Sequence, residues 1–546
     1  MKNSQEMNLL RRICIGDSLK RSAVRHPQKE VLVYSYKGSI THRLSYGELN
    51  RAVNRFANAL IELGIKKGDR VAILSRNSPQ YLIYLYGLGK MGAWTTPLNY
   101  MLRGKEITQL INHAEVNLFI VDDDLADHVA TLQGDMPTVK HYCMINLAKN
   151  KTLPAGWFDF DDLCSEKYSD QEPSVEIEAN DVYSLMYTSG TEAMPKGIMN
   201  SHINWHSTIF TLMAGIGMRS TDVLLQSMPL FHTIQILSHV AIAAGAKVVT
   251  HYETTPEEIM RLIPGEKVTF FAFPPTIFVN ISQLGLPKEK LRAIFPNVTK
   301  IATFGAMAPE TLFKEWMEIL PQVYWINYYG QSELTPMGAM ILHDDILRKY
   351  QALREKGFTG MEPIGQPHFT VEMKVVDEND NALPPWTPGE MVARSPSVML
   401  GYYKEEEKTS STFRGGWHHT GDYAMMDEEG YLYFVDRKKD VIKTGGENVS
   451  SVEIEGAIFG HPKVADCAVL GLPHPRWMEG VTAFVVPKPN EQITEEEILL
   501  FCKGKLAGYK LPKKVIVIEK LPMNPSGKIL KKDLRKQYNN IYAADT

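Results

Sequence analysis

The sequence predicts an α/β protein with a large amino-terminal domain of parallel-rich sheets, flanking helices and a small β-subdomain, followed by a small α+β domain. Two observations lead to this fold class. Short apolar runs alternate with helical patterns through the first two-thirds of the 546 residues, as in consecutive strand–helix units. The last third changes to alternating strand segments and then to a smaller mixed unit, with a boundary expected at 436–440. We therefore divide the chain into domains 1–436 and 437–546.

The expected elements follow this pattern along the chain. An amphipathic helix opens at Ser45, Tyr46 and Leu49 and continues with apolar residues at helical spacing. Strands are expected at 70–75, 118–123, 247–251, 268–273 and 300–305, each of the last four followed by helix-like sequence. A hairpin around an Asn-Asp turn is expected at 371–384, and alternating strands at 389–395 and 430–437. The small unit has expected helices near 451–460 and at 494–507, and strands at 464–471, 480–487 and 514–518.

Composition excludes several classes of protein. The hydrophobic share of 44% and the charged share of 22% are ordinary, and the net charge of -4 argues against bulk attraction to nucleic acid. No apolar stretch reaches the ~18 residues of a membrane-spanning helix, and the start of the chain has no apolar secretory region. Five cysteines without a CxxC pair indicate reduced thiols, so we expect a cytoplasmic protein. Peripheral membrane contact and a homodimer remain open.

The most informative segment is YSLMYTSGTEAMPKGIMNSH at 183–202. An apolar strand runs into a stretch of small polar residues and then a lysine, namely Thr188, Ser189, Gly190, Thr191 and Lys196. Small flexible residues let backbone N–H groups turn toward an anion, the hydroxyls add donors, and Lys196 adds positive charge for phosphate oxygens. The segment lacks the GxxxxGK[ST] spacing of a P-loop. The structural alternative is a polar strand-to-helix turn with a surface lysine.

This segment is similar to the TSGTTGxPKG loop of the AMP-forming adenylating superfamily, which includes acyl-CoA synthetases, adenylation domains of non-ribosomal peptide synthetases and beetle luciferases. The resemblance covers nearly the whole chain. It implies ATP and coenzyme A as co-substrates and Mg²⁺ as a cofactor. In the family, the loop closes over the β- and γ-phosphates of ATP, and Thr188 is a candidate metal contact. Glu192 stands where the family has Thr or Ser, and Ala193 where it has Gly. Glu192 either points away from the phosphates or helps to hold Mg²⁺.

Two further motifs resemble the family's acyl and adenine sites. QSMPLFHT at 226–233 is similar to the motif at the acyl-pocket wall, which makes His232 a candidate catalytic residue; the alternative is a packed or surface histidine. ATFGAMAP at 302–309 is similar to the loop between the acyl group and adenine, with Gly305, Ala306 and Met307 as candidates. A flat base packed against backbone needs a small residue, which Gly305 provides.

INYYGQSELTP at 326–336 resembles the YGxTE motif of the family. Tyr329 offers a flat face for adenine stacking, and Asn327 is expected to recognise the adenine amino group. Glu333 supplies a hard oxygen ligand for Mg²⁺. The alternative is a helix start capped by Ser332. The resemblance implies nucleotide contacts at Asn327, Tyr328, Tyr329, Gly330, Gln331 and Ser332.

The region 416–455 carries TGD, DRKKD and KTGGENV, in the order of the family. Asp422 presents two acceptor oxygens for the ribose hydroxyls, and Arg437 is expected to donate to the ribose or phosphate side. Lys439 lies at the hinge position between the domains. The resemblance implies that a loop with Lys443, Gly445 and Gly446 swings in for thioester formation and contacts CoA.

NPSGKILKKDLR at 524–535 resembles the carboxy-terminal signature of the family, with Lys528 as the adenylation lysine. Its ammonium group is expected to contact the carboxylate and the α-phosphate as charge builds on the transferring group. The catalytic assignment is therefore Lys196, His232, Lys443 and Lys528. The family likeness also implies that the small domain is mobile and rotates between two half-reactions.

The resemblance implies a carboxylic acid:CoA ligase that forms an acyl-adenylate with release of pyrophosphate and then transfers the acyl group to CoA with release of AMP. YGQSE, DRKKDVIKTGGENV and LPxNPSGK most resemble fatty-acyl-CoA synthetases of medium- to long-chain type. Aryl, short-chain and dicarboxylic acids stay open as substrates, and a carrier protein stays open as the acceptor. A nucleotide-binding protein that lost the chemistry is the alternative from another class.

Overall fold

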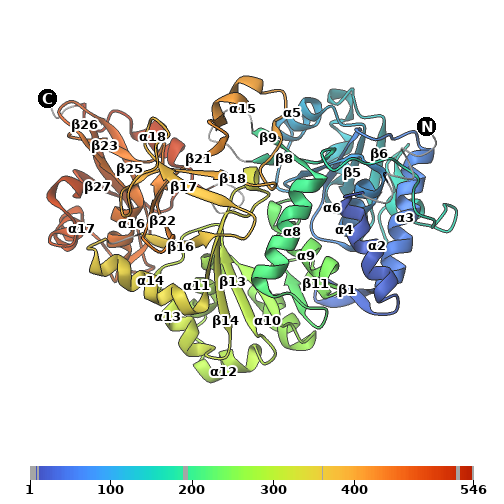
Figure 1. The fold of residues 1–546 in the computed structure, drawn as a ribbon, viewed down its shortest axis with the longest axis horizontal. Coiled ribbons are helices and arrows are strands. Elements are labelled where there is room, and N and C mark those ends of the chain that lie inside the picture. Colours follow the sequence, from blue (N-terminus) through green and yellow to red (C-terminus); the bar gives the residue numbers. More distant parts are fainter. Residues whose placement is uncertain (1–7, 9–11, 189–194, 359–360, 524–528, 544–546) are drawn as a thin grey trace.

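The computed structural model describes residue 8 and the ranges 12–188, 195–358, 361–523 and 529–543. It has a mixed α/β fold with a large amino-terminal domain and a smaller carboxy-terminal domain, which confirms the predicted fold class (Figure 1). Within those ranges the strands form three sheets of fourteen, eight and five strands. The two larger sheets belong to the large domain and the five-stranded sheet to the small one.

The largest sheet joins a parallel half to an antiparallel half, in the order β17-β18-β21-β22-β16-β15-β14-β13-β12-β10-β11-β1-β2, with β20 paired to β21. From β14 to β1 the neighbours are parallel, because helices connect them, whereas β15 to β18 and β20 to β22 pair antiparallel. The parallel half consists of β1 (Glu30–Tyr36), β10 (Val223–Gln226), β11 (Lys247–His251), β12 (Phe270–Phe273), β13 (Lys300–Phe304) and β14 (Tyr324–Tyr329). At its end, β2 (Ser39–Ser45) pairs antiparallel with β1. The antiparallel half has β15 (Ala339–Leu342), β16 (Glu362–Pro367), β17 (Glu372–Val376), β18 (Gly389–Arg394), β20 (Phe413–Arg414), β21 (Trp417–Met426) and β22 (Leu432–Arg437).

The second sheet has the order β19-β9-β8-β4-β3-β5-β6-β7. It is parallel from β8 to β7, and β9 and β19 add antiparallel strands at its other end. Its strands are β3 (Arg70–Leu74), β4 (Trp94–Leu98), β5 (Leu118–Asp122), β6 (His141–Ile145), β7 (Phe158–Asp159), β8 (Val182–Thr188), β9 (Lys196–Ser201) and β19 (Gly401–Tyr402).

Five helices fill the space between these two sheets (Figure 1). Their apolar faces form one cluster with residues of both sheets, such as Leu49 and Trp205 with Val71 and Val248. They are α2 (Ile15–Arg25), α3 (Tyr46–Glu62), α4 (Pro79–Met91), α8 (His202–Ile216) and α9 (Ile236–Ala244). The outer faces of the sheets are covered by α5 (Lys105–Ala114), α6 (Asp123–Ala130), α10 (Pro256–Gly265), α11 (Pro275–Gln283), α12 (Lys288–Ile294), α13 (Glu310–Ile319) and α14 (His343–Glu355). Two short helices, α7 (Phe160–Leu163) and α15 (Glu406–Thr412), lie beside β7 and β19.

The small domain is a sheet of the order β24-β23-β26-β25, with β27 parallel to β26. Helices α16 and α17 pack on one side with Ile454 and Ile498, and α18 packs on a second apolar cluster through Leu534. The elements are β23 (Ile442–Thr444), β24 (Glu447–Val449), α16 (Ser451–Phe459), β25 (Val464–His474), β26 (Met478–Pro487), α17 (Glu495–Cys502), β27 (Lys514–Val517) and α18 (Lys531–Tyr538).

Two expected elements need correction. The stretch 371–384 is not a hairpin of two strands: β17 pairs with β18, and only one bridge, Val376 with Ala382, closes the turn. Pro384 and the proline after it lack the N–H groups that a returning strand would donate. The helix expected at 494–507 ends at Cys502, because Lys503 is extended and Gly504 adopts a positive φ of 85°.

Candidate functional site

The segment expected to bind phosphate lies between two paired strands. Strand β8 ends at Thr188 and β9 begins at Lys196, and these two residues face each other in the antiparallel register. The segment is therefore a strand-to-strand connection, so the alternative of a strand-to-helix turn is wrong. The next helix, α8, begins only after Ser201, whose side chain accepts from the backbone N–H of Asn204 in a capping box. Ser189, Gly190, Thr191, Glu192 and Ala193 lie outside the described residues.

Lys196 stands beside an aromatic and an acidic side chain at the edge of the second sheet. Its ammonium nitrogen lies 5.1 Å from the centre of the Tyr402 ring. The Tyr402 hydroxyl donates to Glu333 Oε1 at 3.0 Å. Burial raises the pKa of Glu333, so a cation beside this carboxyl group would favour its ionised form. The structure thus brings together Lys196 and Glu333, and it adds Tyr402, which the sequence reasoning missed.

A second cluster lies at the carboxyl end of β14. The hydroxyl of Tyr329 donates to Asp422 Oδ2 at 2.6 Å, and Gln331 Nε2 lies 3.2 Å from the same oxygen. Gln331 is held in turn by His418, whose Nε2 lies 3.1 Å from Gln331 Oε1. Burial and the nearby Asp422 charge raise the pKa of Tyr329, so its hydroxyl remains a donor. The cluster joins an aromatic face to a carboxylate.

Arg437 is the strand partner of Asp422 in this cluster, and Lys439, at the expected hinge position, follows two residues later. Asp422 on β21 pairs with Arg437 on β22 in the antiparallel register. Lys438 anchors the turn that follows, since its backbone N–H donates to Gly421 and its side chain pairs with Glu390 at 2.8 Å. Burial and the charges of Arg437 and Lys196 lower the pKa of Lys439. Lys439 is therefore within electrostatic range of Lys196.

Three polar side chains form a buried row beneath Tyr329. Thr303 Oγ1 donates to Asn327 Oδ1 at 2.8 Å, and Asn327 Nδ2 donates to Glu362 Oε1 at 2.8 Å. Gly305 follows β13 with a φ of +78°, and the space beside its Cα is open. These features fit a flat ligand between the Gly305–Ala306 backbone and the Tyr329 ring.

Other residues of the YGxTE-like motif have different surroundings. The Tyr328 side chain lies on the opposite face of β14, stacked on Phe304 with centroids 5.3 Å apart, so it is not part of the Tyr329–Asp422 cluster. A Cβ at Gly330 would lie 1.3 Å from the carbonyl oxygen of Pro336, so packing alone requires glycine there. Ser332 is the first residue of a three-residue 3-10 turn whose N-cap is Gln331, without a side-chain cap, so the alternative of a helix capped by Ser332 is wrong.

His232 is half-buried beside aromatic rings. It precedes the short 3-10 turn Thr233–Gln235 and lies 4.1 Å from the Phe231 ring, which meets the edge of Tyr100 at 5.5 Å. Burial lowers the pKa of His232 to about 4, so the imidazole is neutral at physiological pH. A neutral ring fits an apolar pocket wall better than a proton shuttle.

The loop expected to contact CoA forms backbone hydrogen bonds within the small domain. The backbone N–H of Lys443 donates to Glu479 at 2.7 Å, and that of Gly445 donates to the Trp477 carbonyl at 2.9 Å. Gly445 and Gly446 have φ values of 60° and 86°. Lys443 and Gly445 are therefore hydrogen-bonded to β26 and to the residue just before it, and neither hydrogen bond involves Tyr329 or Asp422. Lys528 lies outside the described residues.

A largely buried polar network surrounds the expected hinge position and reaches helices of the small domain. The Ser451 backbone and hydroxyl both donate to Asp436 Oδ2, at 2.6 and 2.8 Å. Lys531 donates to Ser451 at 2.7 Å and pairs with Glu455 at 2.8 Å. Arg535 of the same helix pairs with Asp440 at 3.2 Å. Charged residues on both sides of Lys439 thus bind the first and last helices of the small domain, a link that sequence spacing did not reveal.

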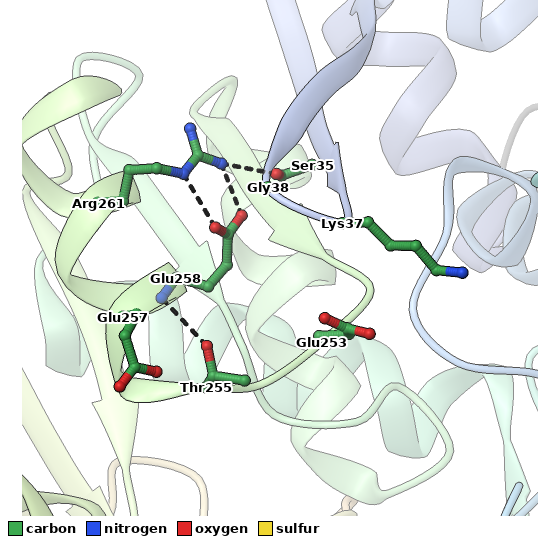
Figure 2. A pocket seen from close by; sticks show the side chains of 8 residues that line it. All are labelled: Ser35, Lys37, Gly38, Glu253, Thr255, Glu257, Glu258 and Arg261. Atoms are coloured by element: carbon green, nitrogen blue, oxygen red, sulfur yellow. Dashed lines mark hydrogen bonds and ion pairs between the residues drawn. The ribbon is translucent and has the colours of Figure 1, made fainter.

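An open pocket far along the large sheet contains none of these residues. Figure 2 shows it between the β1–β2 turn, with Ser35, Lys37 and Gly38, and the start of α10. Arg261 donates to both oxygens of Glu258 and to Ser35 within it. Glu258, one of its acidic side chains, is already paired with Arg261. The pocket shares no residue with the site at β14 and β9.

Comparison with known proteins identifies the family of the chain. The chain matches the model of the AMP-binding enzyme family over residues 19–403 and that of the AMP-binding enzyme C-terminal domain over 453–528. The chain therefore belongs to the AMP-binding enzyme family, and the resemblance found in the sequence is confirmed.

Three similar proteins cover almost the whole chain. A long-chain-fatty-acid–CoA ligase of Thermus thermophilus is 32% identical, covering 98% of this chain and 97% of the relative. The long-chain-fatty-acid–CoA ligase FadD13 of Mycobacterium tuberculosis is 34% identical, covering 96% and 98%. The crystal structure of ATP-bound MatB from Rhodopseudomonas palustris is 28% identical, covers 96% of this chain and 99% of that chain, and superimposes with a TM-score of 0.83.

Two observations on the described residues bear on membranes and metals. No helix among them combines the length and the apolar character needed to cross a bilayer. Nor do they contain a group of three His, Cys, Asp or Glu side chains arranged to hold a metal ion. Mg²⁺ commonly binds through one or two carboxylates together with substrate phosphates, so Glu333 beside Lys196 fits such an ion without further protein ligands.

Proposed function

We propose that this protein is an AMP-forming carboxylic acid:CoA ligase. The observation that carries the proposal is the cluster at the end of β14, where the Tyr329 ring, hydrogen-bonded to Asp422, lies near the open space at Gly305. A ring face, a carboxylate and a glycine-lined space suit the base and ribose of a nucleotide. Lys196 and Glu333 suit its phosphates and their magnesium ion.

The reaction follows from what these groups can bind. A carboxylate oxygen of the acid attacks the α-phosphorus of ATP, and the bond to the bridging oxygen breaks, so that pyrophosphate leaves. The CoA thiolate then attacks the acyl carbon, and AMP leaves with the oxygen that came from the acid. Lys196 neutralises charge on the phosphates, and Lys528 is the proposed partner of the carboxylate and α-phosphate. Glu333 and Thr188 are the proposed residues that would hold Mg²⁺, which would supply further charge neutralisation when bound.

The small domain has a proposed role in the second half-reaction. We propose that residues 1–436 and 437–546 move relative to each other about Lys439. Asp440, beyond Lys439, pairs with Arg535 of α18, so this contact would move with the small domain. The hydrogen bond from Ser451 of α16 to Asp436 crosses the proposed domain boundary, so the rotation would have to break it. Such a rotation would carry Lys443, Gly445 and Gly446 to the acyl-adenylate, where the glycines let pantetheine pass close to the backbone.

A fatty acid is the proposed substrate. The Thermus and Mycobacterium relatives are both named long-chain-fatty-acid–CoA ligases. The neutral His232 ring beside Phe231 and Tyr100 suits an apolar acyl group. Each buried methylene contributes about 0.8 kcal/mol, so chain-length preference would follow from pocket depth.

We also propose that the protein works in the cytoplasm. All five cysteines are free thiols, and four of them are buried, which is in keeping with the cytoplasm. Peripheral contact with a membrane and assembly into a homodimer remain proposals, to be tested by vesicle co-sedimentation and by light scattering.

An acid panel tests the proposed function. The purified protein is incubated with MgATP and fatty acids of increasing length, aryl acids, short-chain acids or dicarboxylic acids, with and without CoA. The proposal predicts AMP and acyl-CoA, with the highest kcat/KM on a fatty acid. ATP binding without turnover of any acid would instead favour a nucleotide-binding protein that lost the chemistry. Acyl-AMP that never passes to CoA would favour a carrier-protein acceptor.

A further inference from the structure

A fully buried carboxyl group on β16 takes part in the row beneath the Tyr329 ring. Glu362 is 4% exposed, and its Oε1 atom accepts from Asn327 Nδ2 at 2.8 Å and from the backbone N–H of Ala308 at 3.0 Å. Neither donor is a cation. Burial raises the pKa of Glu362 to about 8 for this reason. Burying a carboxyl group without a cationic partner costs folding free energy, so its presence on β16 calls for a functional explanation.

The contacts of Glu362 fix which way the Asn327 amide points. A backbone N–H can only donate, so Oε1 of Glu362 must be an acceptor whether or not the carboxyl group carries a proton on Oε2. The group that faces Oε1 must then be the Asn327 amide nitrogen. Asn327 Oδ1 is turned the other way, toward the hydroxyl of Thr303. The carbonyl oxygen has two lone pairs, and Thr303 occupies one of them.

The strand register places this amide beside the proposed base site. Thr303 on β13 and Asn327 on β14 are paired neighbours, and alternate residues of a strand share a face. Gly305 and Tyr329 are thus the next residues on that face, at the carboxyl ends of the two strands. Gly305 leaves open space, and Tyr329 is fixed by Asp422. A flat base lying on the Tyr329 ring would turn one edge toward Asn327.

We propose that Glu362 is a positioning residue for nucleotide specificity: it holds the Asn327 amide so that the carbonyl oxygen meets the exocyclic amino group of adenine. The second lone pair of that oxygen can accept from a 6-amino group but repels the carbonyl oxygen of a 6-oxopurine. The protein therefore selects adenine over hypoxanthine nucleotides. This inference rests on the proposed function, because it requires a nucleotide base at Tyr329.

Two variants of similar size separate positioning from general packing. Glu362→Gln keeps an Oε1 acceptor for Ala308 and Asn327, whereas Glu362→Met fills the space but accepts no hydrogen bond. Binding of AMP and of IMP is measured by calorimetry for the wild type and both variants. The wild type and Glu362→Gln should keep the same preference for AMP. Glu362→Met should lose about tenfold of it, the equivalent of one hydrogen bond.

Each outcome decides the inference. The inference is overturned if Glu362→Met leaves the AMP/IMP affinity ratio unchanged or weakens the binding of both nucleotides equally. It is also overturned if Glu362→Gln loses as much of the AMP preference as Glu362→Met, or if the wild type has no preference. If Glu362→Met does not fold, Glu362→Asp replaces it, since the shorter side chain cannot reach both donors and should also lower the ratio. The same preparations are assayed for acyl-CoA. A ratio that behaves as expected without acyl-CoA from any acid would refute the proposed reaction while supporting the role of Glu362.

Discussion

The buried carboxyl group of Glu362 should make stability depend on pH in an unusual direction. Its pKa is raised from the ordinary 4.5 to about 8 by burial, so the folded state holds this proton more tightly than the unfolded chain does. Stability is therefore greatest below the unfolded pKa and is lost as the pH rises toward the folded pKa. Each unit of pKa corresponds to about 1.4 kcal/mol. The full loss between the two pKa values is then about 5 kcal/mol.

Comparison with Glu362→Gln isolates this contribution. The amide keeps the Oε1 acceptor and cannot ionise, while all other titrating groups are shared and cancel in the difference. Guanidinium unfolding of the large domain is followed for both proteins at about pH 6 and about pH 8. The wild type should lose about 2 kcal/mol relative to the variant across this interval. A difference in unfolding free energy that stays constant between the two pH values would refute the assignment of a neutral, buried Glu362.

Three further substitutions test other parts of the molecule. Asp422→Ala should raise the KM for ATP about 100-fold, through two lost hydrogen bonds to a charged acceptor, and an unchanged KM in steady-state kinetics would count against ribose binding there. Lys349→Met leaves the buried Asp427, now paired at 2.7 Å, without its cation; chemical unfolding should show a loss of about 3–5 kcal/mol that Lys349→Met/Asp427→Asn largely recovers. Lys528→Ala should abolish acid-dependent pyrophosphate exchange yet spare thioester formation from supplied acyl-adenylate, and equal loss of both activities contradicts the proposed division of labour.

Much of the fold could be predicted because its signals are local. The capping box of Ser45 and Glu48 starts α3 where the amphipathic pattern begins, and the apolar runs at 70–75 and 300–305 became buried strands. The structural alternative for the segment before Lys196 was wrong, because it placed a helix directly after this segment, where the strand β9 lies. The Ser201–Asn204 capping box marks the true start of that helix and was readable from the sequence.

The site was harder to predict, because its contacts join residues far apart in the chain. Tyr329 and Asp422 could be named through family resemblance, but nothing local indicates that they share a hydrogen bond. Tyr402 reaches Glu333 because β19 is the edge strand next to β9, which depends on sheet order. Glu362 reads as an ordinary surface residue, and its role depends on the register of β14, β15 and β16.

Isotope transfer is the sharpest test of the acyl-adenylate. The acid found active in the panel is prepared with both carboxylate oxygens replaced by ¹⁸O and is converted with ATP and CoA, and the AMP is examined by mass spectrometry. Attack of the carboxylate on the α-phosphorus predicts AMP that carries one ¹⁸O atom, because the acyl C–O bond breaks when CoA attacks. Unlabelled AMP, or the formation of ADP and phosphate in its place, would contradict adenylation of the acid.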